Sequence, residues 1–146
     1  MMQSFSLLFL RVTTAGLLFW WGLAKALRPA IGENVSNKFY GGMFNAETLL
    51  VGFGWAQVVC ALLLIVGLFR LPLLWVQLAI NTFVAASVWQ SLIDPFWFWM
   101  GGDKPGVVNA LFYPSAIVVA ASLLLIAFRS KDALALDRLI FSGSDR

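Results

Sequence analysis

The sequence predicts an all-α fold: a polytopic membrane protein built as a four-transmembrane-helix bundle with a short C-terminal interfacial helix, in a single transmembrane domain over residues 1–146. Composition is the first reason, because 61% of the residues are hydrophobic and 12% are charged, whereas a soluble domain carries about 25% charged residues. The second reason is that four apolar stretches reach the length of about 20 residues that a helix needs to cross a bilayer core. Their apolar residues do not alternate with polar ones, so a transmembrane β-barrel is not expected.

The four spans are expected at approximately residues 5–27, 48–69, 71–93 and 107–128. Pro29 ends the first span, because proline disfavours the α conformation in the residue before it. Asn45 is the expected N-cap of the second span, with Glu47 near the positive end of the helix dipole. Segment 70–72 contains a proline that a first helical turn tolerates, so it predicts a tight turn into the third span.

The third span is expected to end at Asp94, again before a proline. Trp97 and Trp99 follow in an aromatic run, which is typical of a loop at the membrane interface. Pro114 is expected to kink the fourth span. Segment 132–141 places leucines among charged residues, so it predicts a short helix on the membrane surface.

Charge predicts the orientation. Four spans place both termini on one side of the bilayer, and six of the ten Lys and Arg residues lie on that side: Arg11, Arg70, Arg129, Lys131, Arg138 and Arg146. The other side carries Lys25, Arg28, Lys38 and Lys104. Because basic residues favour the cytoplasmic side, we expect both termini in the cytoplasm.

Residue usage excludes several kinds of chemistry. The chain has no His, which removes a His general base, His-containing zinc sites and ordinary haem ligation. Cys60 is the single cysteine, so neither a CxxC redox pair nor an intrachain disulfide can form. The basic residues are spread singly and make no stripe for a nucleic-acid backbone. We expect no catalytic residue, no metal site and no intrinsic cofactor.

Three short motifs carry a family resemblance. The first span contains Arg11, Gly16, Gly22 and Lys25 in an R-x4-G-x5-G-x2-K pattern, the second ends in Leu-Leu-x-x-Gly67-Leu, and the tail holds Leu-Asp-x-Leu at 136–139. Over nearly the whole chain the sequence resembles the DoxX family of small four-helix membrane proteins. That resemblance implies a helical bundle in the bacterial inner (plasma) membrane and, as in some relatives, an association with quinone-linked redox systems. Gln57 stands where the family often has Glu, and Asn109 stands near another frequent acidic position.

Four polar residues inside the expected spans are candidates for a ligand site: Arg11, Gln57, Gln77 and Asn81. Intramembrane ionisable residues are costly and often functional, so these side chains are expected to line a cavity for a polar head such as a quinone carbonyl. The alternative is that the amides only join helices by hydrogen bonds. Arg11 is expected to face the bundle interior beside Gln77. Because no Asp or Glu lies at its depth, its charge requires carbonyls, amides, water, a ligand, or a tail carboxylate such as Asp132 or Asp137.

Two further contacts are expected. Lys25 and Asp94 lie at the same outer end of the first and third spans and should form an ion pair. Gly52, Ala56 and Cys60 recur every four positions, so another helix is expected to approach them closely.

Three functions remain open from the sequence. The first is an accessory or scaffold subunit of a membrane redox system that performs no chemistry itself, with a redox-complex partner or a second copy of the chain in the bilayer. The second is a quinone-reactive oxidoreductase subunit. The third, a small-solute transporter, lacks the inverted repeats and paired broken helices of common transporter folds.

Overall fold

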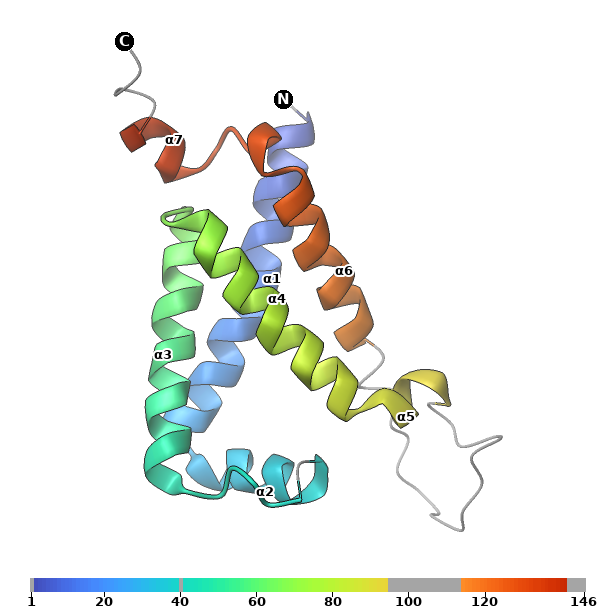
Figure 1. Ribbon diagram of the computed structural model, residues 1–146. Coiled ribbons are helices and arrows are strands. Elements are labelled where there is room, and N and C mark those ends of the chain that lie inside the picture. Colours follow the sequence, from blue (N-terminus) through green and yellow to red (C-terminus); the bar gives the residue numbers. More distant parts are fainter. Residues whose placement is uncertain (1, 40, 95–113, 142–146) are drawn as a thin grey trace.

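The computed structural model describes residues 2–39, 41–94 and 114–141 (Figure 1), and this part of the chain is helical with no strand. The expected all-α class is therefore confirmed. The helices are α1 (Met2–Leu27), α2 (Pro29–Phe39), α3 (Glu47–Val66), α4 (Arg70–Ser87), α5 (Trp89–Ile93), α6 (Pro114–Ala127) and α7 (Leu136–Phe141), with a 3-10 turn at Arg129–Lys131 between α6 and α7.

The described helices fit the expected spans in part. α1 and α3 are long and apolar enough to cross a membrane, and α6 is a shorter apolar helix. The third expected span is divided, because the backbone leaves helical geometry at Val88 (φ −108°, ψ 22°) between α4 and α5. The expected loop with Trp97 and Trp99, the residue Asn109 and the first part of the fourth span lie outside the described residues, so the kink at Pro114 stays a prediction.

The helices form two antiparallel pairs, α1 with α3 and α4 with α6, and α4 crosses over the first pair (Figure 1). The start of α1, the α3–α4 turn, the end of α6 and α7 gather at one end of the bundle, which we call the tail end. α2 and α5 lie at the opposite end. This arrangement places segments that are far apart in the sequence next to one another at the tail end.

The backbones of α1 and α3 come into contact where Gly22 faces Gly54. A Cβ added at Gly54 would lie 2.7 Å from both the Ala26 amide nitrogen and the Gly22 carbonyl oxygen, so the backbones meet without a side chain between them. The expected close approach is wrong at Gly52 and Ala56, since nothing lies within 4 Å of a Cβ added at Gly52 and Ala56 is exposed, whereas Cys60 of the same row is buried in the apolar core. α3 is apolar all round, so its sequence offers more than one row of small residues for packing.

The connections at the opposite end differ from those expected. α1 ends at Leu27 ahead of Pro29, as predicted, but the chain continues as the helix α2. Ala46, and not Asn45, is the N-cap of α3. The Asn45 side-chain amide instead donates to Asn37 Oδ1 at 2.6 Å, while the buried hydroxyl of Ser36 accepts from the Phe44 amide at 2.9 Å. These bonds hold α2 against the start of α3.

The α3–α4 turn depends on Gly67. Its φ of 80° is left-handed, and the amides of Gly67 and Leu68 return to the carbonyls of Leu63 and Leu64, which is the Schellman pattern. Pro72 then lies in the first turn of α4, as the sequence predicts. The turn brings Arg70 to the tail end of the bundle.

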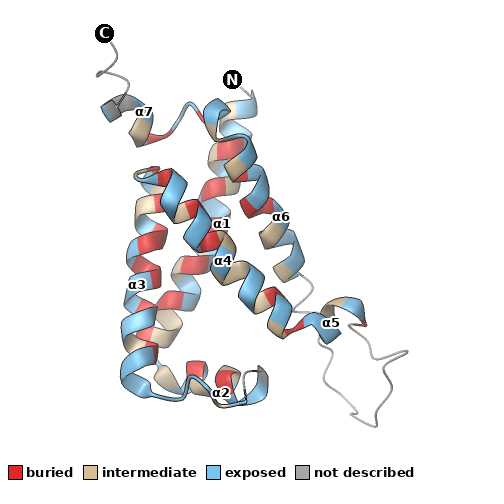
Figure 2. Cartoon of the chain, in the orientation of Figure 1, coloured by how far each residue is buried: buried red, intermediate tan, exposed pale blue. Residues whose placement is uncertain are grey.

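Buried residues follow the facing sides of α1 and α3, and exposed residues follow the outer sides (Figure 2). The main apolar cluster is contributed by four helices and contains Leu7, Ala15, Leu18, Cys60, Ala61, Leu64, Leu74 and Leu125. Many large apolar side chains also point outward, among them Phe53, Val59, Trp75 and Ile117. The outer surface is therefore apolar as well as the core.

Candidate functional site

The most heavily charged buried region is an ion cluster at the tail end, made of Arg11, Arg70, Asp132 and Asp137. Arg11 comes from α1, and its guanidinium pairs with the Asp132 carboxylate and donates to the Leu134 carbonyl oxygen at 3.0 Å. Arg70, the first residue of α4, lies 3.3 Å from the same Asp132 oxygen. Arg11 is 1% exposed and Asp132 3%. The cluster thus joins the first helix, the middle turn and the C-terminal tail.

Asp137 forms the second half of the cluster. Its carboxylate accepts the Phe69 amide at 2.8 Å and the Arg70 amide at 2.9 Å, and Arg70 Nε lies 3.2 Å away. Its own amide donates to the Gly67 carbonyl oxygen at 3.0 Å. Partial burial raises the pKa of Asp137, but the two amides and the Arg70 guanidinium outweigh burial and hold that pKa below its ordinary value. The carboxylate therefore fastens α7 to the α3–α4 turn in its ionised form.

Gly67 provides the space for this contact. A Cβ there would lie 2.9 Å from Ala135 Cβ and 2.9 Å from an Arg11 guanidinium nitrogen. Two buried polar atoms of the cluster, Arg11 Nε and Asp132 Oδ1, have no hydrogen-bond partner among the described residues.

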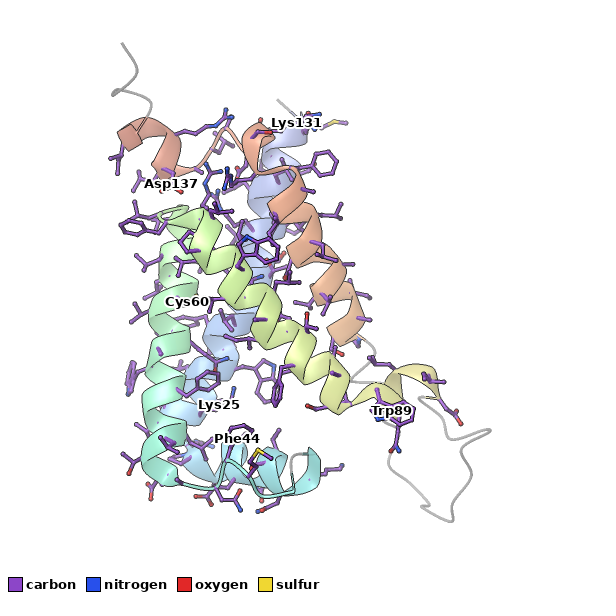
Figure 3. The ribbon with its side chains drawn as sticks, in the orientation of Figure 1. Lys25, Phe44, Cys60, Trp89, Lys131 and Asp137 are labelled. Carbon is purple, nitrogen blue, oxygen red and sulfur yellow. The ribbon has the colours of Figure 1, made fainter. Side chains whose placement is uncertain are left out.

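Lys25 and Gln57 form a second polar contact, which joins the C-terminal part of α1 to the middle of α3 (Lys25 is labelled in Figure 3). Lys25 Nζ donates to Gln57 Oε1 at 2.8 Å and lies 5.3 Å from the Phe53 ring centroid and 5.9 Å from that of Trp21. Side chains tilt toward the N-terminus of their own helix, so in an antiparallel pair these two lean toward each other. The expected ion pair of Lys25 with Asp94 does not form, because the ammonium is directed to Gln57.

Gln77, Asn81 and Ser122 form a third polar contact, between α4 and α6. The amide nitrogens of Gln77 and Asn81 lie 3.3 and 3.2 Å from the Ser122 hydroxyl oxygen, and that hydroxyl donates to the Val118 carbonyl at 2.8 Å. Gln77 and Asn81 lie one turn apart on one face, as expected. Gln77 is buried, but its hydrogen bond goes to Ser122 and not to Arg11.

The four candidate ligand residues therefore occupy three separate places. Arg11 faces inward, as expected, and meets the tail carboxylate Asp132, which the sequence offered as one of several partners. The contribution of Arg70 was missed, although its position at a predicted tight turn was a signal that it would meet the tail. Ser122 as the shared partner of two amides was also missed, since a lone serine in an apolar run gives no pairing signal.

One hollow, of about 420 Å³, lies beside the ion cluster at the tail end. Its apolar side is formed by Phe69, Leu71 and Pro72, and its charged side by the cluster residues Arg70 and Asp137 together with Arg129 and Arg138. No group of three acidic or cysteine side chains that could hold a metal ion occurs within 2–39, 41–94 and 114–141.

Comparison of the chain with models of known protein families, with curated proteins and with solved structures returned no match. The resemblance to the DoxX family therefore stays a prediction from the motifs alone. Function is inferred below from the chain's own residues and contacts.

Proposed function

We propose that this chain is a four-span protein of the bacterial inner membrane, with both termini in the cytoplasm, and that it acts as an accessory or scaffold subunit of a quinone-linked redox system. In this role the chain performs no chemistry of its own. The redox association and the bacterial membrane rest on the resemblance to DoxX.

The outer surfaces of α4 and α6 support the two additional spans. At 1.5 Å per residue, the 18 residues of α4 extend about 27 Å, close to the bilayer core of about 30 Å. Trp75, Val76 and Phe83 of α4 are exposed, as are Leu123 and Leu124 of α6. An exposed apolar surface of this extent is costly in water and favourable in lipid.

The observation that carries the accessory role is that the inner polar side chains bond to one another. Arg11 pairs with Asp132, Lys25 with Gln57, and Gln77 with Ser122. Each contact joins segments distant in sequence, and the three contacts share no residue. Polar contacts of this kind stabilise helix association in membranes.

A quinone-reactive subunit is the second candidate, and one observation favours it. Arg11 Nε is a buried donor without a partner among the described residues, and a quinone carbonyl is a suitable acceptor. The accessory role remains the better supported, because the other Arg11 nitrogens are directed to the tail.

Purification of the full chain from native membranes in mild detergent, followed by mass spectrometry of proteins and lipids, tests the proposal. We expect a stoichiometric redox protein and no quinone that remains with the chain after partner removal. Quinone retained by the isolated chain would replace the accessory role with the quinone-reactive one. Recovery of the chain alone, with neither partner nor quinone, would contradict both.

A further inference from the structure

We propose that the hollow at the tail end binds a phosphate ester that carries an acyl chain, that is, the headgroup region of an anionic phospholipid. The inference rests on the membrane placement in the proposed function, but not on a redox partner. Both charged and apolar residues line the hollow, which is the combination that an amphiphilic anion requires.

The charged side carries excess positive charge. Of the residues that the structure describes, Arg70, Arg129 and Arg138 line the hollow, with Asp137 as the one acidic residue among them. Both Asp137 oxygens already accept hydrogen bonds from the Phe69 and Arg70 amides. The negative charge of Asp137 is also paired with Arg70 Nε at 3.2 Å, so Arg129 and Arg138 remain for an anion.

Arg129 and Arg138 have donors available for a phosphate. Arg129 is half-buried, and no described residue accepts a hydrogen bond from its guanidinium. Arg138 is exposed and donates from one nitrogen to the Ser130 carbonyl oxygen, which leaves most of its five N–H donors unused. Guanidinium groups bind phosphate through paired, charge-assisted hydrogen bonds.

The apolar side opens on the outer surface of the bundle. Phe69 is 54% exposed and Leu71 44%, so an acyl chain in the bilayer can contact them while its phosphate stays at the arginines. Basic residues between or beside transmembrane helices commonly bind the headgroups of anionic lipids. A free phosphate ester would use the arginines and leave the apolar side bare.

The test is native mass spectrometry of the full chain in neutral detergent with equal amounts of phosphatidylglycerol and phosphatidylcholine. We expect preferential retention of phosphatidylglycerol, and about tenfold weaker retention in the Arg129→Gln/Arg138→Gln double variant, which loses two charged donors. Lys131→Gln is the matched control, since Lys131 is a nearby cation that does not line the hollow. Thermal unfolding of each variant confirms that it is folded.

Two further measurements distinguish a lipid from a free phosphate ester as the ligand of the hollow. Glycerol 3-phosphate should not displace the lipid at equal concentration, and Leu71→Ser should weaken lipid retention several-fold while leaving glycerol 3-phosphate binding unchanged. Equal retention of phosphatidylcholine, an equal loss in Lys131→Gln, or displacement by equimolar glycerol 3-phosphate would each overturn the lipid site. None of these results alters whether a redox partner co-purifies, so the two proposals fail separately.

Discussion

Arg11 of α1 and Asp132 of the C-terminal tail stand 121 positions apart and form an ion pair in which both side chains are buried. Burial of either charge alone is strongly unfavourable, so the pair can persist only while the tail lies on the end of the bundle. Asp132 also meets Arg70. The contact therefore couples the position of the tail to both the first helix and the α3–α4 turn.

The α1–α3 crossing predicts opposite effects at two glycines of one helix. Gly54→Ala should destabilise the protein by about 1–3 kcal/mol or more, because the new methyl group meets the backbone of α1. Gly52→Ala is the matched control, since its Cβ meets nothing within 4 Å, and alanine is favoured over glycine in a helix by about 0.5–1 kcal/mol. Unfolding midpoints in detergent measure both variants. Equal midpoints would show that the two helices do not touch at Gly54.

The Asp137 contact predicts a pH dependence at the tail end. The pKa of Asp137 is lower in the folded state than in the unfolded chain, so its contribution is complete above the unfolded pKa and disappears as pH falls through the folded value. We expect the protection factors of the Phe69 and Arg70 amides, that is, their exchange rates relative to the intrinsic rate at each pH, to be constant near neutral pH and to fall below about pH 4. Asp137→Asn should have lower protection factors than the wild type at neutral pH, and the two proteins should converge at low pH, where Asp137 is protonated. Protection factors that are independent of both pH and the substitution would contradict the contact.

The buried face of α1 could be predicted because its signals lie within one helix. Positions 11, 15, 18 and 22 repeat at helical spacing with small residues among them, and the structure buries all four. The face of α3 could not, because that helix is apolar on every side and two rows of small residues compete. Gly52 and Ala56 stay outside although Cys60 of the same row is buried, whereas Gly54 packs against α1.

Partner choice was harder to predict than burial. Arg11 and Gln77 are expected at the same depth in the bilayer and therefore side by side. However, a long side chain points toward the N-terminus of its own helix, which for Arg11 is the tail end of the bundle. The return of the tail over Gly67 decided the pairing, and no local pattern specifies that path. The Lys25 side chain also points toward the N-terminus of α1. It therefore donates to Gln57 and not to the expected partner Asp94.

The Lys25–Gln57 contact predicts that the protein tolerates a carboxylate at position 57 but is destabilised when the side-chain oxygen that accepts from Lys25 is removed. Gln57→Leu should destabilise the protein by about 1–3 kcal/mol, because the Lys25 ammonium keeps its partly buried place without an acceptor. Gln57→Glu keeps an oxygen acceptor and adds an opposite charge, so its stability should match or exceed that of the wild type at neutral pH. The free energy of unfolding in mixed micelles measures both. A greater loss of stability in Gln57→Glu than in Gln57→Leu would show that Lys25 does not contact residue 57.

The ion cluster predicts an asymmetric double-mutant cycle. Asp132→Asn should destabilise the protein by about 3–5 kcal/mol, because it leaves two buried arginines, Arg11 and Arg70, without their shared carboxylate. Arg11→Met keeps an unbranched apolar stem, removes the guanidinium and should cost less, since Asp132 retains Arg70. In the double variant, one unpaired cation has been removed, so its loss should fall short of the sum of the single losses by at least about 1 kcal/mol.

The free energy of unfolding of the four proteins in mixed micelles completes the cycle, and protease cleavage after Lys131 or Arg138 reports on the tail. We expect Asp132→Asn to be cleaved fastest, because the tail then has no carboxylate for Arg11 to hold. The Arg11→Met/Asp132→Asn protein should be cleaved at a rate between those of the wild type and Asp132→Asn. Losses that add within about 0.5 kcal/mol would mean that the two side chains act independently. In that case Arg11 extends to the headgroups on its own, and the tail is held by Asp137 alone.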